Sequence, residues 1–237
     1  MNLGQSINRL LGRKGLELRR SDAYRRACLL RHHRIDLVFD VGAARGMYGR
    51  ELRKSGYEAV IVSFEPLDDA FARLQRESSD DPKWHVRQNA LGATTGDLVI
   101  NIAGNSDSSS LLPMLDRHTA AAPTTSYVGA QTVSLRRLDE LAGEWMDSAS
   151  RVLLKIDTQG FERDVLEGAN GIINDIWGVQ IELTFEPLYE GGMLFDEAIE
   201  LLLSRGFVLQ GLEPGFRDPA NQQLLQADGL FFRALPR

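Results

Sequence analysis

The chain has 237 residues, of which 43% are hydrophobic and 25% charged, so it can bury one sizeable core and global disorder is excluded. This length favours a single α/β domain with additions. The single cysteine, Cys28, excludes an internal disulfide framework and a thiolate metal site, and it points to a reducing compartment.

Charge is distributed unevenly along the chain. Residues 1–34 carry nine basic side chains against Glu17 and Asp22, a local net charge of +7, whereas the remaining residues carry −13. An acidic body argues against nucleic acid as the partner, although the basic arm could make a weak contact with phosphate or with an anionic membrane surface. The sequence shows no transmembrane segment and no signal peptide, so we expect a cytoplasmic protein.

The arm at 1–34 is expected to be helical, and residues 35–237 are expected to form the main domain. Strand-like apolar runs alternate with helical patterns in its first part, which is the signature of a parallel sheet with right-handed crossovers. The strands are predicted at 35–41, 59–64, 84–90 and 98–103. Residues 104–130 are rich in Ser, Thr, Asp, Ala and Pro without a clear period, and they predict a lid-like loop.

A second α/β stretch follows this loop. The pattern predicts strands at 152–157, 179–185, 207–212 and 229–234, with helices after the first two of them. The last two strands are joined by a turn rich in Pro and Gly, so the sheet is expected to finish with an antiparallel strand. The fold class is therefore α/β, a Rossmann-like, doubly wound and mostly parallel sheet.

A carboxylate, Asp40, ends the first strand and precedes a turn of small residues that begins at Gly42. A dinucleotide-binding loop would have glycine where Ala44 and Met47 stand, and the Asp40 carboxylate would repel a pyrophosphate. The same carboxylate suits a cationic ligand without phosphate, such as S-adenosylmethionine (SAM), which carries an ammonium and a sulfonium. The alternative role for Asp40 is that of a turn or cap residue.

The next two strand ends carry polar residues as well. Glu65 stands where a carboxylate can accept hydrogen bonds from both hydroxyls of a ribose, and Pro66 opens the following helix. The alternative for Glu65 is a solvated strand end, but two acids in this order favour a nucleoside site. Asn89 and Ala90 end the third strand, where an adenine would lie, and an ordinary turn is nearly as well supported.

These segments resemble the FkbM-type family of class I SAM-dependent methyltransferases. The resemblance covers residues 35–190 and includes residues 39–43 (Phe-Asp-Val-Gly-Ala) with Gly46, 64–66 (Phe-Glu-Pro), 89–92, 108–111, 135–139 and 154–162 (Leu-Lys-Ile-Asp-Thr-Gln-Gly-Phe-Glu). It implies a seven-stranded sheet and O-methyl transfer to sugars, lipopolysaccharides, glycolipids or polyketides. Ala44 departs from the asparagine that the family often has. The expected cofactor-binding residues are Asp40, Gly42, Ala43, Gly46, Glu65, Pro66, Asn89 and Ala90.

Methyl transfer to a neutral hydroxyl also needs a base or a metal that removes or acidifies the proton. Asp157 is the leading base, because it ends the strand expected across the topological switch from Asp40, where ligands of open α/β sheets bind. Glu162 and Glu182 are further candidates, and with Asp157 they could instead coordinate Mg²⁺. We favour the version without metal. Helix capping is the alternative for Glu162.

Three other hypotheses compete with a small-molecule O-methyltransferase. A nucleic-acid methyltransferase would use the basic arm, and a nicotinamide-dependent oxidoreductase would need the glycine spacing that is missing. A binding module without catalysis is the third, and Asp157 argues against it. Lys155 is expected either to orient Asp157 or an anionic acceptor, or to form a structural pair, and His118 is a reserve base. The sequence is compatible with a homo-oligomer.

Overall fold

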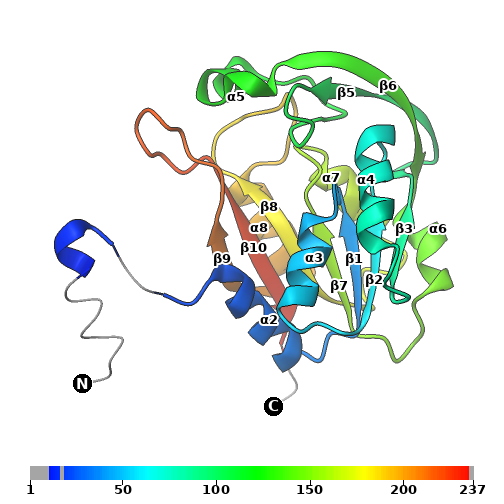
Figure 1. Ribbon diagram of the computed structural model, residues 1–237. Helices are drawn as coiled ribbons and strands as arrows, with labels where there is room; N and C mark the ends of the chain where they lie inside the picture. Colours follow the sequence, from blue (N-terminus) through cyan, green and yellow to red (C-terminus); the bar gives the residue numbers. More distant parts are fainter. Residues whose placement is uncertain (1–10, 17–18, 235–237) are drawn as a thin grey trace.

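A seven-stranded sheet forms the centre of the computed structural model, which describes residues 11–16 and 19–234 (Figure 1). The strand order is β3-β2-β1-β7-β8-β10-β9. Strand β10 is antiparallel to both of its neighbours, and the other paired strands are parallel. The predicted mostly parallel, Rossmann-like sheet is thereby confirmed. Its strands are β1 (Leu37–Val41), β2 (Val60–Phe64), β3 (Trp84–Arg87), β7 (Val152–Ile156), β8 (Ile176–Thr184), β9 (Phe207–Pro214) and β10 (Gln226–Arg233).

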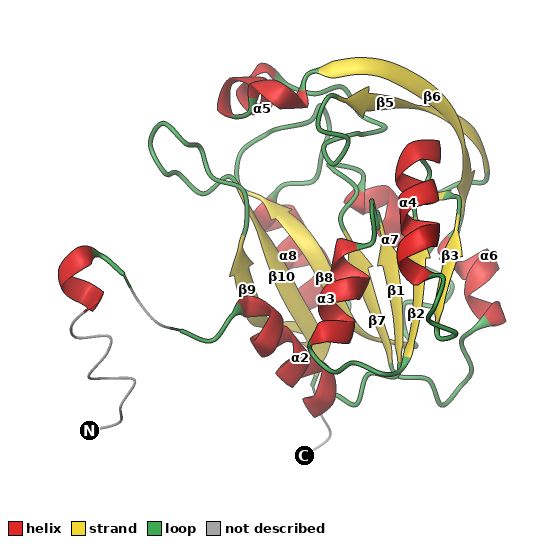
Figure 2. Ribbon diagram, in the orientation of Figure 1, coloured by secondary structure: helices red, strands yellow, loops and turns green. Residues whose placement is uncertain are grey.

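Helices cover both faces of this sheet (Figure 2). One face packs against α2 (Asp22–His32), α3 (Met47–Lys54) and α4 (Asp68–Ser78), and the other against α6 (Leu138–Leu141), α7 (Glu162–Gly168) and α8 (Phe195–Ser204).

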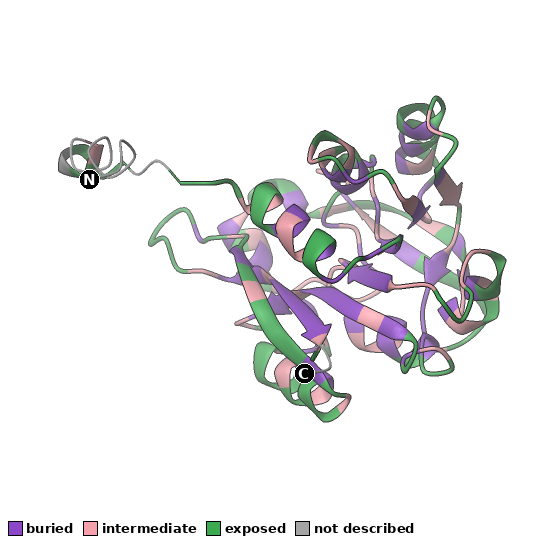
Figure 3. Ribbon diagram, turned by 90° about the horizontal axis from the view of Figure 1, so that it is seen from below, coloured by how far each residue is buried: buried purple, intermediate pink, exposed green. Residues whose placement is uncertain are grey.

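Successive side chains of a strand point to opposite faces of the sheet, so each central strand contributes to the core on both faces. Phe39 and Val41 join the core under α7 and α8, whereas Val38 joins the core under α3 and α4. By the same alternation, Asp40 faces the α3 side. The central strands are almost wholly buried (Figure 3).

A second, three-stranded sheet lies over the edge at which the parallel strands end (Figure 1). It contains β4 (Ala90–Leu91), β5 (Gly96–Ala103) and β6 (Tyr127–Arg136) in the order β4-β6-β5. Its buried residues Ile100, Val133 and Leu135 pack against Leu67 and Ala70. The strand predicted at 84–90 is therefore divided between the two sheets, because the chain leaves β3 at Arg87 and resumes pairing at Ala90.

The segment 104–130 is more ordered than predicted. It contains α5 (Asp116–Ala121), a 3-10 helix η2 (Pro123–Thr125) and the start of β6, so only its first part is a loop. The sequence shows no clear hydrophobic period here because α5 is only six residues long. The first half of β6 is also largely exposed, so apolar and polar residues alternate little along it. Arg117 of α5 forms ion pairs with Glu186 at 2.8 Å and with Asp218 at 2.7 Å, which tie α5 to the segments that follow β8 and β9.

The predicted arm at 1–34 is part of the domain from Ser21 onward. The Ser21 hydroxyl accepts a hydrogen bond from the Tyr24 N–H and caps α2, a standard way to begin a helix. Ala27 and Leu30 of α2 are buried, so this helix packs on the sheet layer. A 3-10 helix, η1 (Gly12–Lys14), precedes it, and residues 1–10 and 17–18 of the arm lie outside the described part. Within the described residues, no helix is long and apolar enough to span a membrane.

Candidate active site

A cavity of about 460 Å³ lies between the carboxyl ends of the parallel strands and the small sheet. This is the position and size expected for a ligand site in an open α/β fold. One end is lined by the turn after β1, the start of α4 and the small sheet, and the other end by α2, α3, β9 and β10. Asp157 lies at the end of β7, between these two ends.

Glu65 lies in the first end of the cavity and is held by the backbone. Its Oε2 accepts a hydrogen bond from the Ala44 N–H at 2.8 Å, and its Oε1 accepts one from the Leu67 N–H at 2.9 Å. Burial raises the pKa of Glu65 to about 7, although both backbone donors favour the charged form. The carboxylate is therefore fixed in orientation and keeps lone pairs for a ligand's hydroxyl groups.

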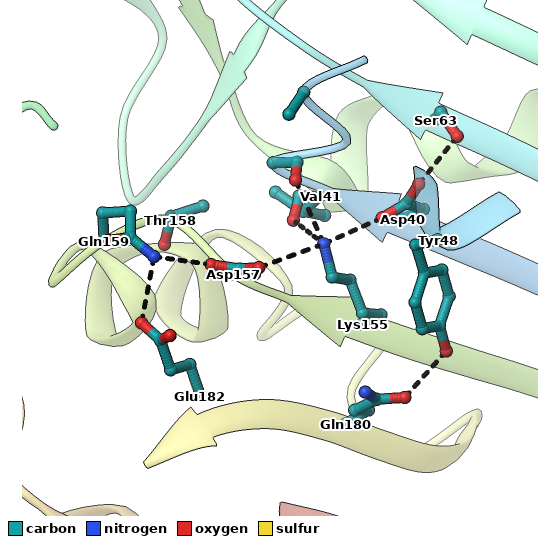
Figure 4. Close-up of polar contacts among 12 residues, drawn as sticks. Asp40, Val41, Tyr48, Ser63, Lys155, Asp157, Thr158, Gln159, Gln180 and Glu182 are labelled. Atoms are coloured by element: carbon teal, nitrogen blue, oxygen red, sulfur yellow. Dashed lines mark hydrogen bonds and ion pairs between the residues drawn. The ribbon is translucent and has the colours of Figure 1, made fainter. Parts of the chain in front are cut away.

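Asp40 is fully buried, and it does not line the cavity. Its Oδ1 lies 3.0 Å from Lys155 Nζ, and its Oδ2 accepts a hydrogen bond from the Ser63 hydroxyl at 2.9 Å (Figure 4). The register of the sheet explains these contacts, because Ser63, Asp40 and Lys155 are direct neighbours on β2, β1 and β7 and so share a face. This differs from the expectation that the Asp40 carboxylate itself faces a cationic ligand.

Lys155 connects Asp40 to the cavity wall. Its ammonium donates to the Gly42 carbonyl at 3.0 Å and lies 3.7 Å from Asp157 Oδ2 (Figure 4). Burial opposes its charge, but the carboxylates of Asp40 and Asp157 outweigh burial and raise the pKa of Lys155. The buried cation thus fixes the turn after β1 and the Asp157 carboxylate relative to each other.

The Asp157 side chain is 38% exposed and lines the cavity. The Gln159 side-chain amide donates to Asp157 Oδ1 at 2.8 Å and to Glu182 Oε2 at 3.1 Å (Figure 4). Asp157 is therefore a carboxylate held from both sides, by Lys155 and by Gln159, with part of its surface open to the cavity.

Glu162 and Glu182, the other predicted catalytic residues, do not line this cavity. Glu162 Oε1 accepts hydrogen bonds from the backbone N–H groups of Thr158 and Gly160, both at 3.0 Å, so it closes the turn before α7. The N-cap of α7 is Phe161, which makes no side-chain cap hydrogen bond, so this role differs from the helix capping that the sequence left as the alternative. Glu182 accepts from Gln159 and, at 2.6 Å, from the Gln226 amide.

The remaining predicted cofactor-binding residues are mostly brought together. Gly46 does not line the cavity and begins α3 with a φ of 83°, which favours glycine. Gly42 has a φ of 74°, and a Cβ atom there would lie 1.9 Å from the Asp157 carbonyl oxygen, so this turn needs glycine for the close approach of β1 and β7. The cavity lining includes Gly42, Ala43, Glu65, Pro66, Asn89 and Ala90.

The segment after β5 lines one side of the cavity with Ser106, Asp107, Ser109 and Leu111. Asp107 forms an ion pair at 2.6 Å with Arg45, which also lines the cavity. The Ser110 hydroxyl donates to the Gln159 carbonyl at 2.6 Å, and the Tyr189 hydroxyl lies within hydrogen-bond distance of the Ser108 carbonyl, at 3.1 Å.

Several lining residues were not predicted from the sequence. Their residue types do not predict that they line a cavity, because strand register or helix packing brings each of them there. Glu213 and Asp228 each stand one residue outside a predicted strand, at 207–212 and 229–234, and enter β9 and β10 only in the structure. The group comprises Arg26, Tyr48, Glu51, Phe161, Gln180, Glu213 and Asp228.

Comparison with known proteins identifies the family. The family model described as Methyltransferase FkbM domain matches residues 40–209. The chain belongs to the FkbM methyltransferase family. This confirms the resemblance, and the chain is a SAM-dependent methyltransferase.

Individual relatives of this FkbM methyltransferase are distant. Methyltransferase 1 of Beauveria bassiana (strain ARSEF 2860) is 25% identical over 193 residues, which cover 77% of this chain and 76% of that protein. The 2-O-methyltransferase NoeI of Sinorhizobium fredii (strain NBRC 101917 / NGR234) is 23% identical over 180 residues, which cover 73% of this chain and 74% of that protein. A solved rRNA methylase from Streptococcus thermophilus has a TM-score of 0.49 at 11% identity, covering 92% of this chain and 99% of that one.

The first end of the cavity has a donor set that fits SAM. Glu65 offers a fixed carboxylate for ribose hydroxyls, and Leu91, Ile100 and Phe161 give the same cavity apolar surface. Arg45, the basic side chain beside this end, is already paired with Asp107, so the site suits a nucleoside without a pyrophosphate. Within the described residues, no group of three or more His, Cys, Asp or Glu side chains is arranged to hold a metal ion.

Proposed function

We propose that this FkbM methyltransferase methylates a hydroxyl group of a sugar, a glycolipid or a glycosylated or polyketide compound. The observation that carries the proposal is the geometry of Asp157, a carboxylate fixed on both sides and open to the middle of the cavity. Transfer to a neutral hydroxyl requires removal of its proton, and a carboxylate at this point can accept it. The relative named 2-O-methyltransferase NoeI supports an oxygen acceptor.

The cofactor-binding residues in this proposal are those of the first end of the cavity. Glu65 accepts hydrogen bonds from the ribose of SAM, and Asn89 and Ala90 lie beside its adenine base. Gly42 and Ala43 lie beside its amino-acid portion. SAM supplies an electrophilic methyl group on its sulfonium when it is bound.

Asp157 Oδ2 is the atom that we expect to receive the hydroxyl proton. Gln159 already donates to Oδ1, so Oδ2 is the oxygen that faces Lys155 and keeps a lone pair for the acceptor. Lys155 and Gln159 act as positioning residues, because they limit the rotation of the carboxylate. Holding the acceptor oxygen within about 3 Å of the reacting carbon supplies much of the rate enhancement.

The proposal is tested by incubating the enzyme with SAM that carries a labelled methyl group and with panels of candidate acceptors. Neutral and amino sugars, glycolipid extracts and RNA form separate arms, and each labelled product is hydrolysed to identify the methylated atom. We expect a methyl ether on a sugar or polyketide hydroxyl. Label on RNA or on a nitrogen atom would contradict the proposal. Parallel reactions with EDTA and with added Mg²⁺ measure whether a metal is required.

A further inference from the structure

The cavity is longer than its cofactor-binding end requires. Glu65 follows β2 and Glu213 lies on β9, and five strand-to-strand steps separate these two strands in the sheet order. At about 4.8 Å per step, the two carboxylates are separated by roughly 24 Å of sheet. Asp157, after β7, lies between them. The half of the cavity beyond Asp157 is therefore available to an acceptor, provided that the proposed function holds.

This second half is formed where α2 and α3 lie near β9 and β10 (Figure 1). Arg26 of α2 lies 3.1 Å from Glu51 of α3 and 3.5 Å from Glu213, so one guanidinium joins three elements. Asp228 of β10 is the register partner of Glu213 and lines the cavity beside it.

Negative charge is in excess in this half. Its walls carry the carboxylates of Glu51, Glu213, Asp228 and, at the junction, Asp157, against the single guanidinium of Arg26. Lys155, the other cation on the wall, is already paired with the fully buried Asp40. A cluster of acidic side chains also occurs on ordinary surfaces, so the state of its buried atoms decides what this one can do.

Two buried polar atoms on this wall have no hydrogen-bond partner among the described residues, Glu213 Oε1 and Arg26 Nε. Glu213 is only 9% exposed and Arg26 only 6%. A buried polar atom without a partner costs free energy, so the pairing with Arg26 compensates the Glu213 carboxylate only in part. Burial also raises the pKa of Glu213 to about 7 and that of Asp228 to about 6, as expected for carboxylates that lack a sufficient counter-charge.

From these contacts we propose that the second half of the cavity is the acceptor subsite and that it selects a hydroxylated acceptor carrying an ammonium group, such as an amino sugar. The ammonium binds between Glu213 and Asp228, where it supplies the missing positive charge. A hydroxyl of the same molecule then lies toward Asp157.

The test compares two oligosaccharides that differ mainly in charge, a glucosamine oligomer and its N-acetylated form. Binding to the enzyme saturated with S-adenosylhomocysteine is measured by calorimetry, and methylation is measured with labelled SAM. We expect the amino form to bind about 10-fold more tightly or better, the scale of a charge-assisted hydrogen bond in a buried site. Equal binding of the two forms would overturn the proposal.

Variants identify the residues. Glu213→Gln and Asp228→Asn remove a charge while keeping the shape, and each should reduce the affinity for the glucosamine oligomer by about 10-fold or more. S-adenosylhomocysteine binding should change by less than about 2-fold, because Glu65 lies at the opposite end of the cavity. Glu200→Gln, at an exposed position of α8, is the matched control. Thermal melting shows whether each variant is folded. If Glu213→Gln does not fold, the binding test is made with Asp228→Asn alone.

The two proposals fail in different ways. If the glucosamine oligomer binds selectively and depends on Glu213 or Asp228, but no hydroxyl of any acceptor is methylated, the proposed function is wrong and the ammonium subsite remains. If neutral sugars are methylated as efficiently as amino sugars, the proposed function stands and the ammonium subsite is wrong. Loss of amino-sugar binding in Glu200→Gln would also contradict the assignment.

Discussion

Replacing Lys155 with methionine tests the buried charge pair beneath the active site. The methionine side chain has a similar length and keeps most of the packing against Tyr48, whose ring centroid lies 5.3 Å from Lys155 Nζ. The substitution removes the cation 3.0 Å from an Asp40 carboxylate that is 0% exposed. Among the described residues, the Ser63 hydroxyl, at 2.9 Å, is then the side-chain donor left to that carboxylate.

Breaking a buried pair by removing one partner typically costs about 3–5 kcal/mol of folding free energy, because the other charge stays buried without compensation. Both side chains here are at least nine-tenths buried, so we expect the full range. At about 2–4 °C per kcal/mol for a chain of this size, the melting temperature should fall by roughly 6–20 °C. Lys155→Met should also weaken SAM binding, since the Gly42 carbonyl loses its donor.

The assay is a double-variant cycle followed by urea and thermal unfolding. Asp40→Asn combined with Lys155→Met removes both charges, so the double variant should be more stable than Lys155→Met alone. Lys54→Met, at an exposed position of α3, controls for loss of a lysine. We expect neither of two results: a free energy of unfolding of Lys155→Met that lies within about 1 kcal/mol of the wild-type value, or a double variant with Asp40→Asn that is no more stable than Lys155→Met. Either result would refute the uncompensated-charge explanation.

Three further predictions concern residues that line the cavity. Asp157→Asn should leave SAM binding intact and lower turnover by about 100-fold or more, the usual scale for a general base, and near-normal turnover would refute this role. Gly42→Ala should destabilise the fold by about 2 kcal/mol or more, since its Cβ would meet the Asp157 carbonyl oxygen, and an unchanged urea midpoint would contradict that. With its pKa at about 7, Glu65 becomes neutral as the pH falls, so SAM affinity should decrease from about pH 8 to about pH 6. Glu65→Gln should bind SAM more weakly and lose this pH dependence; a wild-type pH profile in the variant would disprove the assignment.

Much of the fold was predictable because strands and helices here carry clear periodicity. Within the apolar runs predicted at 35–41 and 152–157, the strands Leu37–Val41 and Val152–Ile156 are buried on both faces, so their composition alone marks them as central strands. Residues 127–136 gave no such signal, since β6 pairs in a small sheet with one exposed face and is interrupted by Gly129. Pairing with β5, which sequence periodicity does not encode, is what makes this segment a strand.

The site was predictable to the extent that it depends on strand ends. Glu65, Asn89 and Asp157 reach the cavity because the carboxyl ends of parallel strands meet at one edge. Lys155 acquired its role through register, which places it opposite Asp40, and a single sequence does not specify register. Arg26 reaches the cavity only because α2 packs beside β9, a tertiary contact about 190 residues apart in the chain.

The position of Asp40 changes how this enzyme attracts a cationic cofactor. Its charge is offset by Lys155 at 3.0 Å, so the pair presents little net field to the cavity. The negative potential along the cavity must therefore come from carboxylates that line it, Glu65 at one end and Glu213 with Asp228 at the other. SAM brings a sulfonium and, on our proposal, the acceptor brings an ammonium. These two cations would repel each other unless Asp157 lies between them, which adds an electrostatic reason for a carboxylate at the middle of the cavity.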